Sequence, residues 1–375
     1  MLGLALVLYA LDRFHSAALA GWVGFTAVAP GLLLSPIAGA MLDRVGSAAA
    51  IAVDMVCSAG CVLTLAALGL AGADSATSLL VITALYSLTG PLSAAGVRAL
   101  LPTLVPAAAL DRANALDTGI FAVTEVLGPA LAGALFGFIG AATTFLVIAV
   151  LFGAASASLA PAARARTRRV RLRGGRLLAD AGAGVVHVLR HPSLRALAFG
   201  YAAYQVSWGI LLVAVPVFVA RLLGGDASGN FVIGVLWSAS GLAGGVGALL
   251  AGHVGAFGRE RGVIALGMLA SAVAIYPLSP RFGLAGLGFG LMLVGFLSGP
   301  IDVGVLTLRQ RRTDPEWLGR VMSVSMALNM SGLPIGSALG GMLIGWSTGW
   351  TFGIAAAACL LAAAAVWMLV PARAT

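Results

Sequence analysis

The sequence predicts an all-α polytopic membrane protein made of two pseudo-symmetric six-helix bundles. Its mean hydropathy is +1.04, and only 9% of its residues are charged, whereas a soluble domain carries about 25%. A chain this poor in charge cannot cover a water-facing surface, so the bilayer is its expected solvent. The one long polar stretch is residues 161–195, which holds nine of the 22 arginines and separates two apolar halves of similar length.

The expected spans follow from apolar stretches of about 20 residues. Met1–Leu11 is too short to cross, so we interpret it as the outer half of a shortened first span. A signal peptide is not expected, because Asp12 and Arg13 interrupt the apolar run and no positive charge precedes it. The other predicted spans are 17–41, 47–72, 78–101, 113–138, 140–160, 196–220, 230–256, 262–279, 283–307, 320–345 and 347–370.

These spans predict three parts: an N-terminal bundle at 1–160, a basic cytoplasmic linker at 161–195 and a C-terminal bundle at 196–375. If the linker is cytoplasmic, 19 arginines lie inside and only Arg13, Arg221 and Arg281 lie outside. That bias follows the positive-inside rule and predicts two cytoplasmic termini. The linker is also expected to contact anionic lipid.

Several other classes of protein are not expected. The chain contains no lysine, which a Walker A ATPase and a retinal Schiff base both require. It has no zinc-protease helix, nucleophile elbow or cluster of metal ligands. We therefore expect no enzyme, no cofactor, no metal site and no binding of nucleic acid by the arginine strip.

The two halves repeat each other. Leu88-Thr-Gly-Pro91 matches Leu297-Ser-Gly-Pro300 at an offset of 209 residues, and Leu110-Asp-Arg112 matches Leu318-Gly-Arg320 at an offset of 208. Such repeats are typical of transporters whose halves are related by an axis along the membrane normal. Pro91 and Pro300 are expected to be hinges or kinks.

Three groups of motifs resemble the major facilitator superfamily over nearly the whole chain. The loop Gly39-Ala-Met-Leu-Asp43-Arg44-Val-Gly46 resembles its signature G-x-L-x-D-R-x-G-R-R. The other two groups are Arg98 to Pro106 with Gly128-Pro129-Ala-Leu-Ala-Gly133, and Arg309 to Asp314 with Gly319 to Ser323. Together they resemble bacterial drug exporters near the enterobactin-exporter-like branch, which implies a monomer in a bacterial inner membrane.

The resemblance implies roles for these residues, and three departures limit them. It implies a gating loop in which Asp43 pairs with Arg98. The residues of this gating loop are Gly39, Asp43, Arg44, Gly46 and Arg98. Ser47 and Ala48 replace the basic pair that normally closes this loop. Gly128, Pro129 and Gly133 would form the antiporter motif, in which Ala132 replaces a glycine. No arginine lies in the middle of 78–101, so proton coupling by the common arrangement is not implied.

Two carboxylates are candidates for proton coupling, since ionisable groups at membrane depth are costly. Glu125 is the deepest, about 20 Å along its helix from Arg112. A low dielectric disfavours its charged form, so it can exchange a proton; a structural hydrogen bond is the other interpretation. Asp302 is interpreted either as an ion-pair partner at the cytoplasmic gate, two turns from Arg309, or as a coupling group.

A substrate cavity is predicted where polar and aromatic residues share a helix face. Tyr201, Tyr204, Gln205 and Trp208 are spaced i, i+3, i+4, i+7 and so lie on one face. They suit amphipathic, partly aromatic solutes, although helix packing explains the pattern equally well. Asn329 is the candidate from 320–345, where core filling is the alternative.

The sequence therefore predicts a secondary transporter that exports small amphipathic molecules, a drug or a secondary metabolite, by proton antiport and alternating access, with Glu125 as the favoured proton carrier. Its expected partners are the solute, protons and the bilayer. An importer or uniporter on the same fold is the first alternative, because a fold does not determine direction or solute. A membrane sensor or assembly partner that transports nothing is the second.

Overall fold

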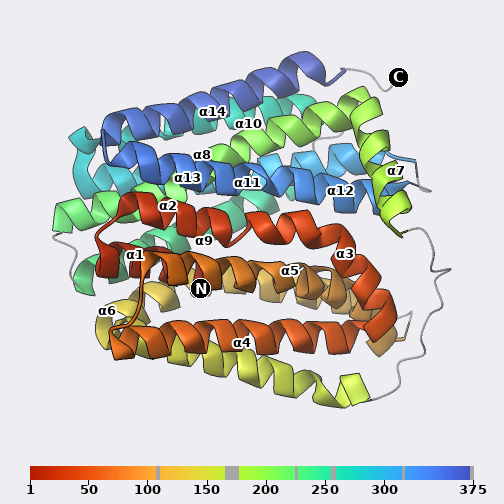
Figure 1. The fold of residues 1–375 in the computed structure, drawn as a ribbon. Coiled ribbons are helices and arrows are strands. Elements are labelled where there is room, and N and C mark those ends of the chain that lie inside the picture. Colours follow the sequence, from red (N-terminus) through yellow and green to blue (C-terminus); the bar gives the residue numbers. More distant parts are fainter. Residues whose placement is uncertain (107–109, 165–176, 224–226, 255–258, 315–316, 372–375) are drawn as a thin grey trace.

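The computed structural model describes residues 1–106, 110–164, 177–223, 227–254, 259–314 and 317–371, apart from some side chains within the helices. Its long helices run side by side, and one short helix, α7, lies across one end (Figure 1). The helices are α1 Leu2–Phe14, α2 Ala17–Thr26, α3 Ala29–Val45, α4 Ser47–Ala71, α5 Ala76–Leu104, α6 Leu110–Arg164, α7 Leu177–Arg190, α8 Pro192–Leu223, α9 Ala227–Val254, α10 Glu260–Ala274, α11 Gly283–Arg311, α12 Leu318–Met330, α13 Gly332–Ile344 and α14 Thr348–Leu369, with short 3-10 turns at Tyr276–Leu278 and Pro280–Phe282.

Ten helical stretches of the described chain are long and apolar enough to cross a membrane. The longest, Val123–Pro161, accounts for two crossings, because Gly140 interrupts α6 with φ 77° and ψ 170°. Glycine suits that position, since other residues are strained at such a φ. The break lies where the sequence predicts the boundary between the spans 113–138 and 140–160. At 13 residues, α1 is too short to cross, as expected for Met1–Leu11.

Two spans are interrupted near their middles, and a proline explains each break. The span that begins with α2 stops at Thr26, four residues before Pro30, and continues as α3. Likewise α12 stops at Met330, four residues before Pro334, and continues as α13. Proline lacks the N–H that would bond the carbonyl four residues earlier. In contrast, α5 and α11 continue through Pro91 and Pro300, the expected kinks.

The two halves share a packing detail that supports the sequence repeat. In the N-terminal half, a Cβ added to Gly31 would lie 2.2 Å from the carbonyl oxygen of Ser87; in the C-terminal half, one added to Gly247 would lie 2.1 Å from that of Phe296. Both carbonyls lie four residues before a proline, Pro91 or Pro300, which cannot donate to them. A glycine on a neighbouring helix therefore packs on the equivalent carbonyl in each half.

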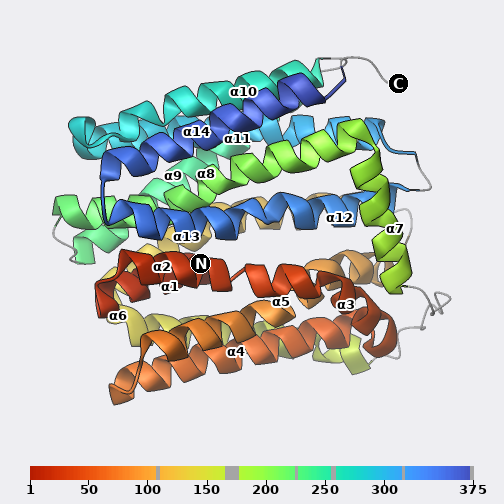
Figure 2. The same cartoon turned by 45° about the horizontal axis from the view of Figure 1, so that its top comes forward.

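The segment predicted as a linker contains helices. Within 161–195, α6 extends to Arg164, α7 covers Leu177–Arg190 and α8 begins at Pro192, while the densest arginine run, 165–176, lies outside the described residues. Figure 2 shows α7 crossing the end of the molecule beside α8, α12 and α3. His187 stacks on Trp317 of the loop before α12, with ring centroids 4.4 Å apart. We call this end of the molecule the α7 end and the opposite one the far end.

Candidate functional site

The two halves contact each other first through α2 and α13. A Cβ added to Gly21 would lie 2.6 Å from the carbonyl oxygen of Ser337, and one added to Gly341 would lie 2.4 Å from that of Ala17. Ser337 is fully buried, and its hydroxyl donates to the carbonyl oxygen of Gly21 at 3.1 Å. Small residues allow this backbone approach, which stabilises helix pairs where lipid removes the hydrophobic driving force.

The second contact between the halves joins α6 to α9 and contains the predicted antiporter motif. A Cβ added to Gly133 would lie 2.4 Å from the carbonyl oxygen of Asn230, and the carbonyl of Pro129 lies against Gly234. Gly128 is buried beside the amino group of Met1. The motif therefore allows two helices of different halves to pack closely, as Gly21 and Gly341 do between α2 and α13.

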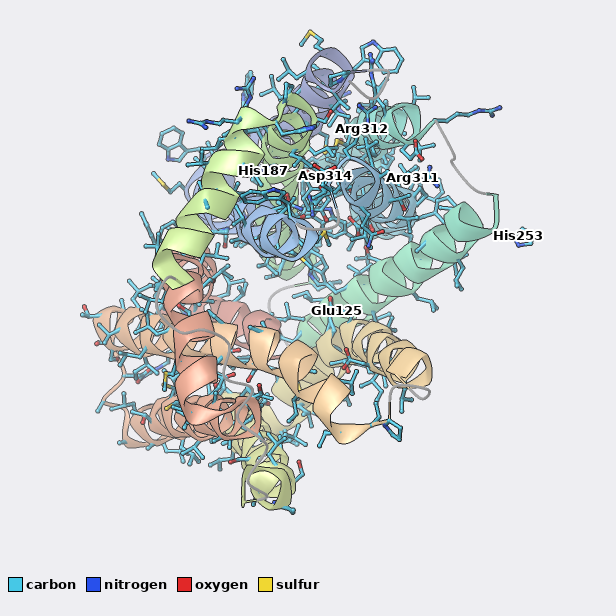
Figure 3. The ribbon with its side chains drawn as sticks, turned by 90° about the vertical axis from the view of Figure 1, so that its right-hand side faces the viewer. Glu125, His187, His253, Arg311, Arg312 and Asp314 are labelled. Atoms are coloured by element: carbon cyan, nitrogen blue, oxygen red, sulfur yellow. The ribbon has the colours of Figure 1, made fainter. Side chains whose placement is uncertain are left out.

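Towards the α7 end the halves separate. In the described part of the chain, α3 and α12, which continue α2 and α13, have few contacts with each other. Glu125 lies on α6 between the two groups of helices in the view from the α7 end (Figure 3). Its side chain and that of Asp302 on α11 are both exposed. Among the described residues, Glu125 and Asp302 are therefore exposed carboxylates within long helices of different halves.

Asp302 forms a hydrogen bond with Tyr201, one of the residues predicted to line the substrate cavity. The hydroxyl of Tyr201 on α8 donates to its Oδ1 atom at 2.6 Å, the length of a charge-assisted hydrogen bond. The next residue before it, Ile301, is fully buried, and α8 is the most enclosed of the candidate spans. Asp302 therefore lies against α8 through its bond to Tyr201. The ion pairs of the described residues do not include one between Asp302 and Arg309.

The other predicted cavity residues of α8 differ in exposure. Tyr204 is 1% exposed, and its hydroxyl has no hydrogen-bond partner among the described residues. Gln205 is 9% exposed and donates to the Met330 sulfur at 3.8 Å. Trp208 is partly exposed beside Trp237 of α9, with ring centroids 6.0 Å apart. Tyr201 and Trp208 thus remain accessible, while Tyr204 and Gln205 are packed.

Asn329 and Arg309 form a polar contact that sequence reasoning missed. Both side chains are at most 4% exposed. With its amide oriented to satisfy both atoms, Asn329 accepts from Nη2 of Arg309 at 2.9 Å and donates to the carbonyl of Ser325 at 3.0 Å. Nε of Arg309 has no partner among the described residues. The basic run at 309–312 was the available signal, but it does not show which arginine turns inward.

The predicted gating loop is described only in part. Gly39, Asp43 and Arg44 lie in α3 and Arg98 lies in α5, and their side chains fall outside the described part of the structure. Gly46 precedes α4 with φ 93°, a backbone conformation that favours glycine. The proposed pairing of Asp43 with Arg98 therefore stays a prediction.

Comparison with known proteins identifies the family. The model of the Major Facilitator Superfamily matches residues 1–196 and again 197–375. The chain is 45% identical to an uncharacterized MFS-type transporter, y4rN, of Sinorhizobium fredii (strain NBRC 101917 / NGR234) over 99% of this chain and 91% of that protein. That relative supports membrane transport and does not indicate a solute or a direction.

Solved structures share the fold at low sequence identity. The nucleoside transporter NupG aligns with a TM-score of 0.76 and 10% identity, covering 98% of this chain and 96% of that one. The inward-open xylose transporter XylE from E. coli aligns with a TM-score of 0.68 and 12% identity, covering 98% and 92%. With two family matches that together span its length, this chain is a multi-pass membrane transporter of the major facilitator superfamily.

Proposed function

We propose that the protein exports small, partly aromatic amphipathic molecules in exchange for protons, by alternating access. The pair formed by Tyr201 and Asp302 carries this proposal, because it places an exposed carboxylate and an aromatic hydroxyl together inside the bundle. A charge at membrane depth is costly unless it has a task such as ion or substrate binding. The exporter motifs and the antiporter motif of α6 favour export.

Asp302 is the proton carrier that the geometry favours. Protonation removes its negative charge and leaves Tyr201 bonded to a neutral carboxyl group, so the exposed face of α11 becomes less polar. A solute that competes with the proton would bind to the ionised form. Glu125 is a second candidate, because its side chain is exposed and has no side-chain hydrogen bond among the described residues.

The solute would contact the accessible part of the same face. Tyr201 and Trp208 present aromatic rings with a hydroxyl and an indole N–H, a combination that suits solutes with apolar and polar parts. Three buried residues would pack behind these rings and hold them in place, namely Tyr204, Gln205 and Asn329. We further propose a monomer in a bacterial inner membrane with the α7 end in the cytoplasm, where α14 also ends (Figure 1).

Proton-coupled export can be tested in everted membrane vesicles whose lumen is acidified and monitored with a pH-sensitive dye. Ethidium, as an aromatic cation, would be compared with uridine and xylose as polar solutes. We expect ethidium to discharge the gradient in wild type and not in Asp302→Asn. Tyr201→Phe, which loses one charge-assisted hydrogen bond, should slow the discharge about tenfold. Tyr86→Phe, another tyrosine within a span, is the matched control.

The outcomes separate the alternatives. If Asp302→Asn discharges the gradient as wild type does but Glu125→Gln does not, the carrier is Glu125. If labelled uridine or xylose moves without any change in the gradient, the protein is a uniporter and antiport is wrong. If folded wild-type protein moves none of the three solutes and never alters the gradient, the proposed export of aromatic amphipaths is contradicted.

A further inference from the structure

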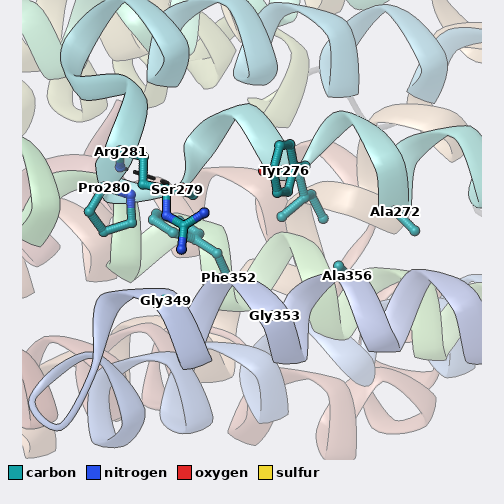
Figure 4. Close-up of a pocket in the computed structure, with 10 residues that line it drawn as sticks. Ala272, Tyr276, Ser279, Pro280, Arg281, Gly349, Phe352, Gly353 and Ala356 are labelled. Carbon is teal, nitrogen blue, oxygen red and sulfur yellow. Dashed lines mark hydrogen bonds between the residues drawn. The ribbon is translucent and has the colours of Figure 1, made fainter.

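A cavity lies at the far end of the C-terminal half, away from the candidate transport site. It has a volume of about 530 Å³ and lies between α14 and the 3-10 turns that follow α10. Figure 4 shows the side chains of Tyr276, Ser279 and Arg281 on one wall and the glycines of α14 on the other. The candidate carboxylates Glu125 and Asp302 do not line it.

Arg281, which lines this cavity, differs in its bonding from Arg13 and Arg221, the other two arginines expected outside the cytoplasm. Both Nε and Nη2 of Arg13 bond to Asp74, at 2.7 and 2.9 Å. The guanidinium of Arg221 donates to the hydroxyl of Thr348 and the carbonyl of Ile344, both at 2.8 Å. The guanidinium of Arg281 has no hydrogen-bond or ion-pair partner in the part of the chain that the structure describes. It is therefore available to an anion.

The cavity changes from polar to apolar along its length. Its outer end has the cation of Arg281 and the hydroxyl of Ser279, and its deeper end is lined by Ala272, Gly353 and Ala356. Gly349 and Ala356, which line it on α14, are seven residues apart, about 10 Å along the helix. A Cβ added to Gly353 would meet no atom within 4 Å. The groove therefore leads from a cation into the apolar span.

The surroundings place the outer end of the groove at the membrane interface. Trp346 is 89% exposed, Trp350 is 75% exposed and Tyr276 is 61% exposed. Exposed tryptophan and tyrosine are typical of the level of lipid headgroups. Deeper on the same surface, Val273 is 68% exposed, as expected of a side chain that faces acyl chains.

We propose that this groove binds an anionic phospholipid, with the phosphate on Arg281 and the start of one acyl chain along Gly353 and Ala356. A lipid fits better than a soluble anion because one molecule must satisfy a cation at the interface and an apolar groove inside the span. The site is distinct from the basic linker, which was expected to contact lipid at the α7 end. It does not depend on the direction or solute of transport.

The test uses the full-length protein in detergent and phosphatidylglycerol that carries a photoactivatable acyl chain. Cross-linked peptides would be mapped, and lipid binding would be measured by native mass spectrometry. We expect cross-links to Thr348–Leu369 in wild type. Arg281→Gln should weaken phosphatidylglycerol binding about tenfold or more, as loss of a charge-assisted bond predicts. Gly353→Leu should fill the deeper groove, since Gly353 lines it and a Cβ there would meet no atom within 4 Å.

Matched controls identify the ligand. Arg259→Gln, an exposed arginine at the other end of α10, should leave the α14 cross-links unchanged. Diacylglycerol with the same chains should bind at least tenfold more weakly than phosphatidylglycerol. The proposal is overturned if Arg281→Gln and Gly353→Leu both cross-link as wild type does, or if diacylglycerol binds equally well. It is also overturned if glycerol phosphate alone displaces the lipid at equal concentration, since the site would then take a free anion.

Discussion

The carboxylates of this protein differ in their exposure and in the hydrogen-bond donors that they accept from. Asp54 is 3% exposed, and it accepts from the hydroxyls of Ser58 and Ser93, so it joins α4 to α5. Asp74 accepts from Tyr9 and from two nitrogens of Arg13. Asp302, in contrast, is exposed and has one side-chain donor among the described residues, Tyr201. A carboxylate with its bonds complete has a structural task, whereas an exposed one within a span is free to bind a proton or a solute.

Asp74 leads to a prediction about pH and stability. The guanidinium of Arg13, and after it the hydroxyl of Tyr9, lower the pKa of Asp74 from 3.8 to about 2 against the opposing effect of burial. Because the folded state has the lower pKa, the stabilisation is complete above about pH 4 and is lost as the pH falls towards 2. Thermal unfolding in detergent between pH 6 and pH 2 measures it.

The matching variant is Asp74→Asn, which removes the titrating group and keeps the size of the side chain. We expect it to unfold at a lower temperature than wild type at pH 6 and to approach wild type as the pH falls towards 2. Asp12→Asn, next to Arg13 near the end of α1 but outside the bond between Arg13 and Asp74, is the control. A constant difference between Asp74→Asn and wild type at every pH would contradict the ion pair.

At the scale of the helix, glycines determine how closely two elements approach. On α9, Gly247 is buried, and a Cβ there would lie 2.1 Å from the backbone oxygen of Phe296. Two residues earlier, Gly245 is exposed, and a Cβ there would meet nothing within 4 Å. The two positions have the same residue type on the same helix, but only one of them faces α11.

We predict that Gly247→Ala destabilises the protein by about 1–3 kcal/mol, because backbone must move to accept the methyl group. Gly245→Ala should be neutral or stabilising, since alanine loses less conformational entropy in a helix than glycine does. Thermal unfolding of the two variants in the same detergent compares them directly. Equal melting temperatures for the two variants would show that α9 and α11 do not pack as described.

At the scale of the molecule, the two halves are joined at the far end and apart at the α7 end. Both joining contacts, α2 with α13 and α6 with α9, are made by glycines against backbone. Two of the four helices, α2 and α13, are separated by proline breaks from α3 and α12. In the proposed alternating access, this arrangement would let the segments at the α7 end move while the far end stays closed.

We predict that Gly341→Leu opens the far end, because even a Cβ at Gly341 would lie 2.4 Å from the carbonyl of Ala17. The reporter is Leu306→Cys, on the same face of α11 as Asp302 and 42% exposed. All three native cysteines would be replaced by serine. An impermeant maleimide should label the reporter from the α7 side alone in the parent, and from both sides with Gly341→Leu.

Gly153→Leu, at a position with open space around it, is the control and should label as the parent does. If Gly341→Leu leaves labelling from the far side absent while the protein stays folded, then α2 and α13 do not close that end. If the parent is already labelled from both sides, the closed far end itself is wrong for the protein in a membrane.

Much of the fold could be predicted from the sequence because its signals are local. The apolar stretches predicted the spans, and the break before Gly140 was placed correctly in the longest helix. The interrupted spans were missed, although Pro30 and Pro334 were visible, because a proline alone does not show whether a helix breaks. Pro91 and Pro300, expected to be hinges or kinks, lie in continuous helices.

The residues of the candidate site could be predicted from the sequence, but their exposure could not. The spacing of Tyr201 and Tyr204 put them on one helix face, but it could not show that Tyr201 is accessible while Tyr204 is 1% exposed. Exposure depends on which neighbours cover each side chain, and the helices packed most closely on α8 are α13 and α14, more than 100 residues away. Arg309 was missed for the same reason.

The sequence by itself determined the membrane environment, the helical class, the repeated halves and the absence of lysine chemistry. These depend on the composition and order of residues along each span, because the bilayer requires every crossing segment to be apolar and to bond its own backbone. Only the tertiary structure decided that Asp302 pairs with Tyr201, 101 residues earlier, that glycines join the halves at one end, and that Arg281 faces a groove. Contacts of this kind depend on how rigid helices pack, and packing is a property of the pair of surfaces and not of either segment alone.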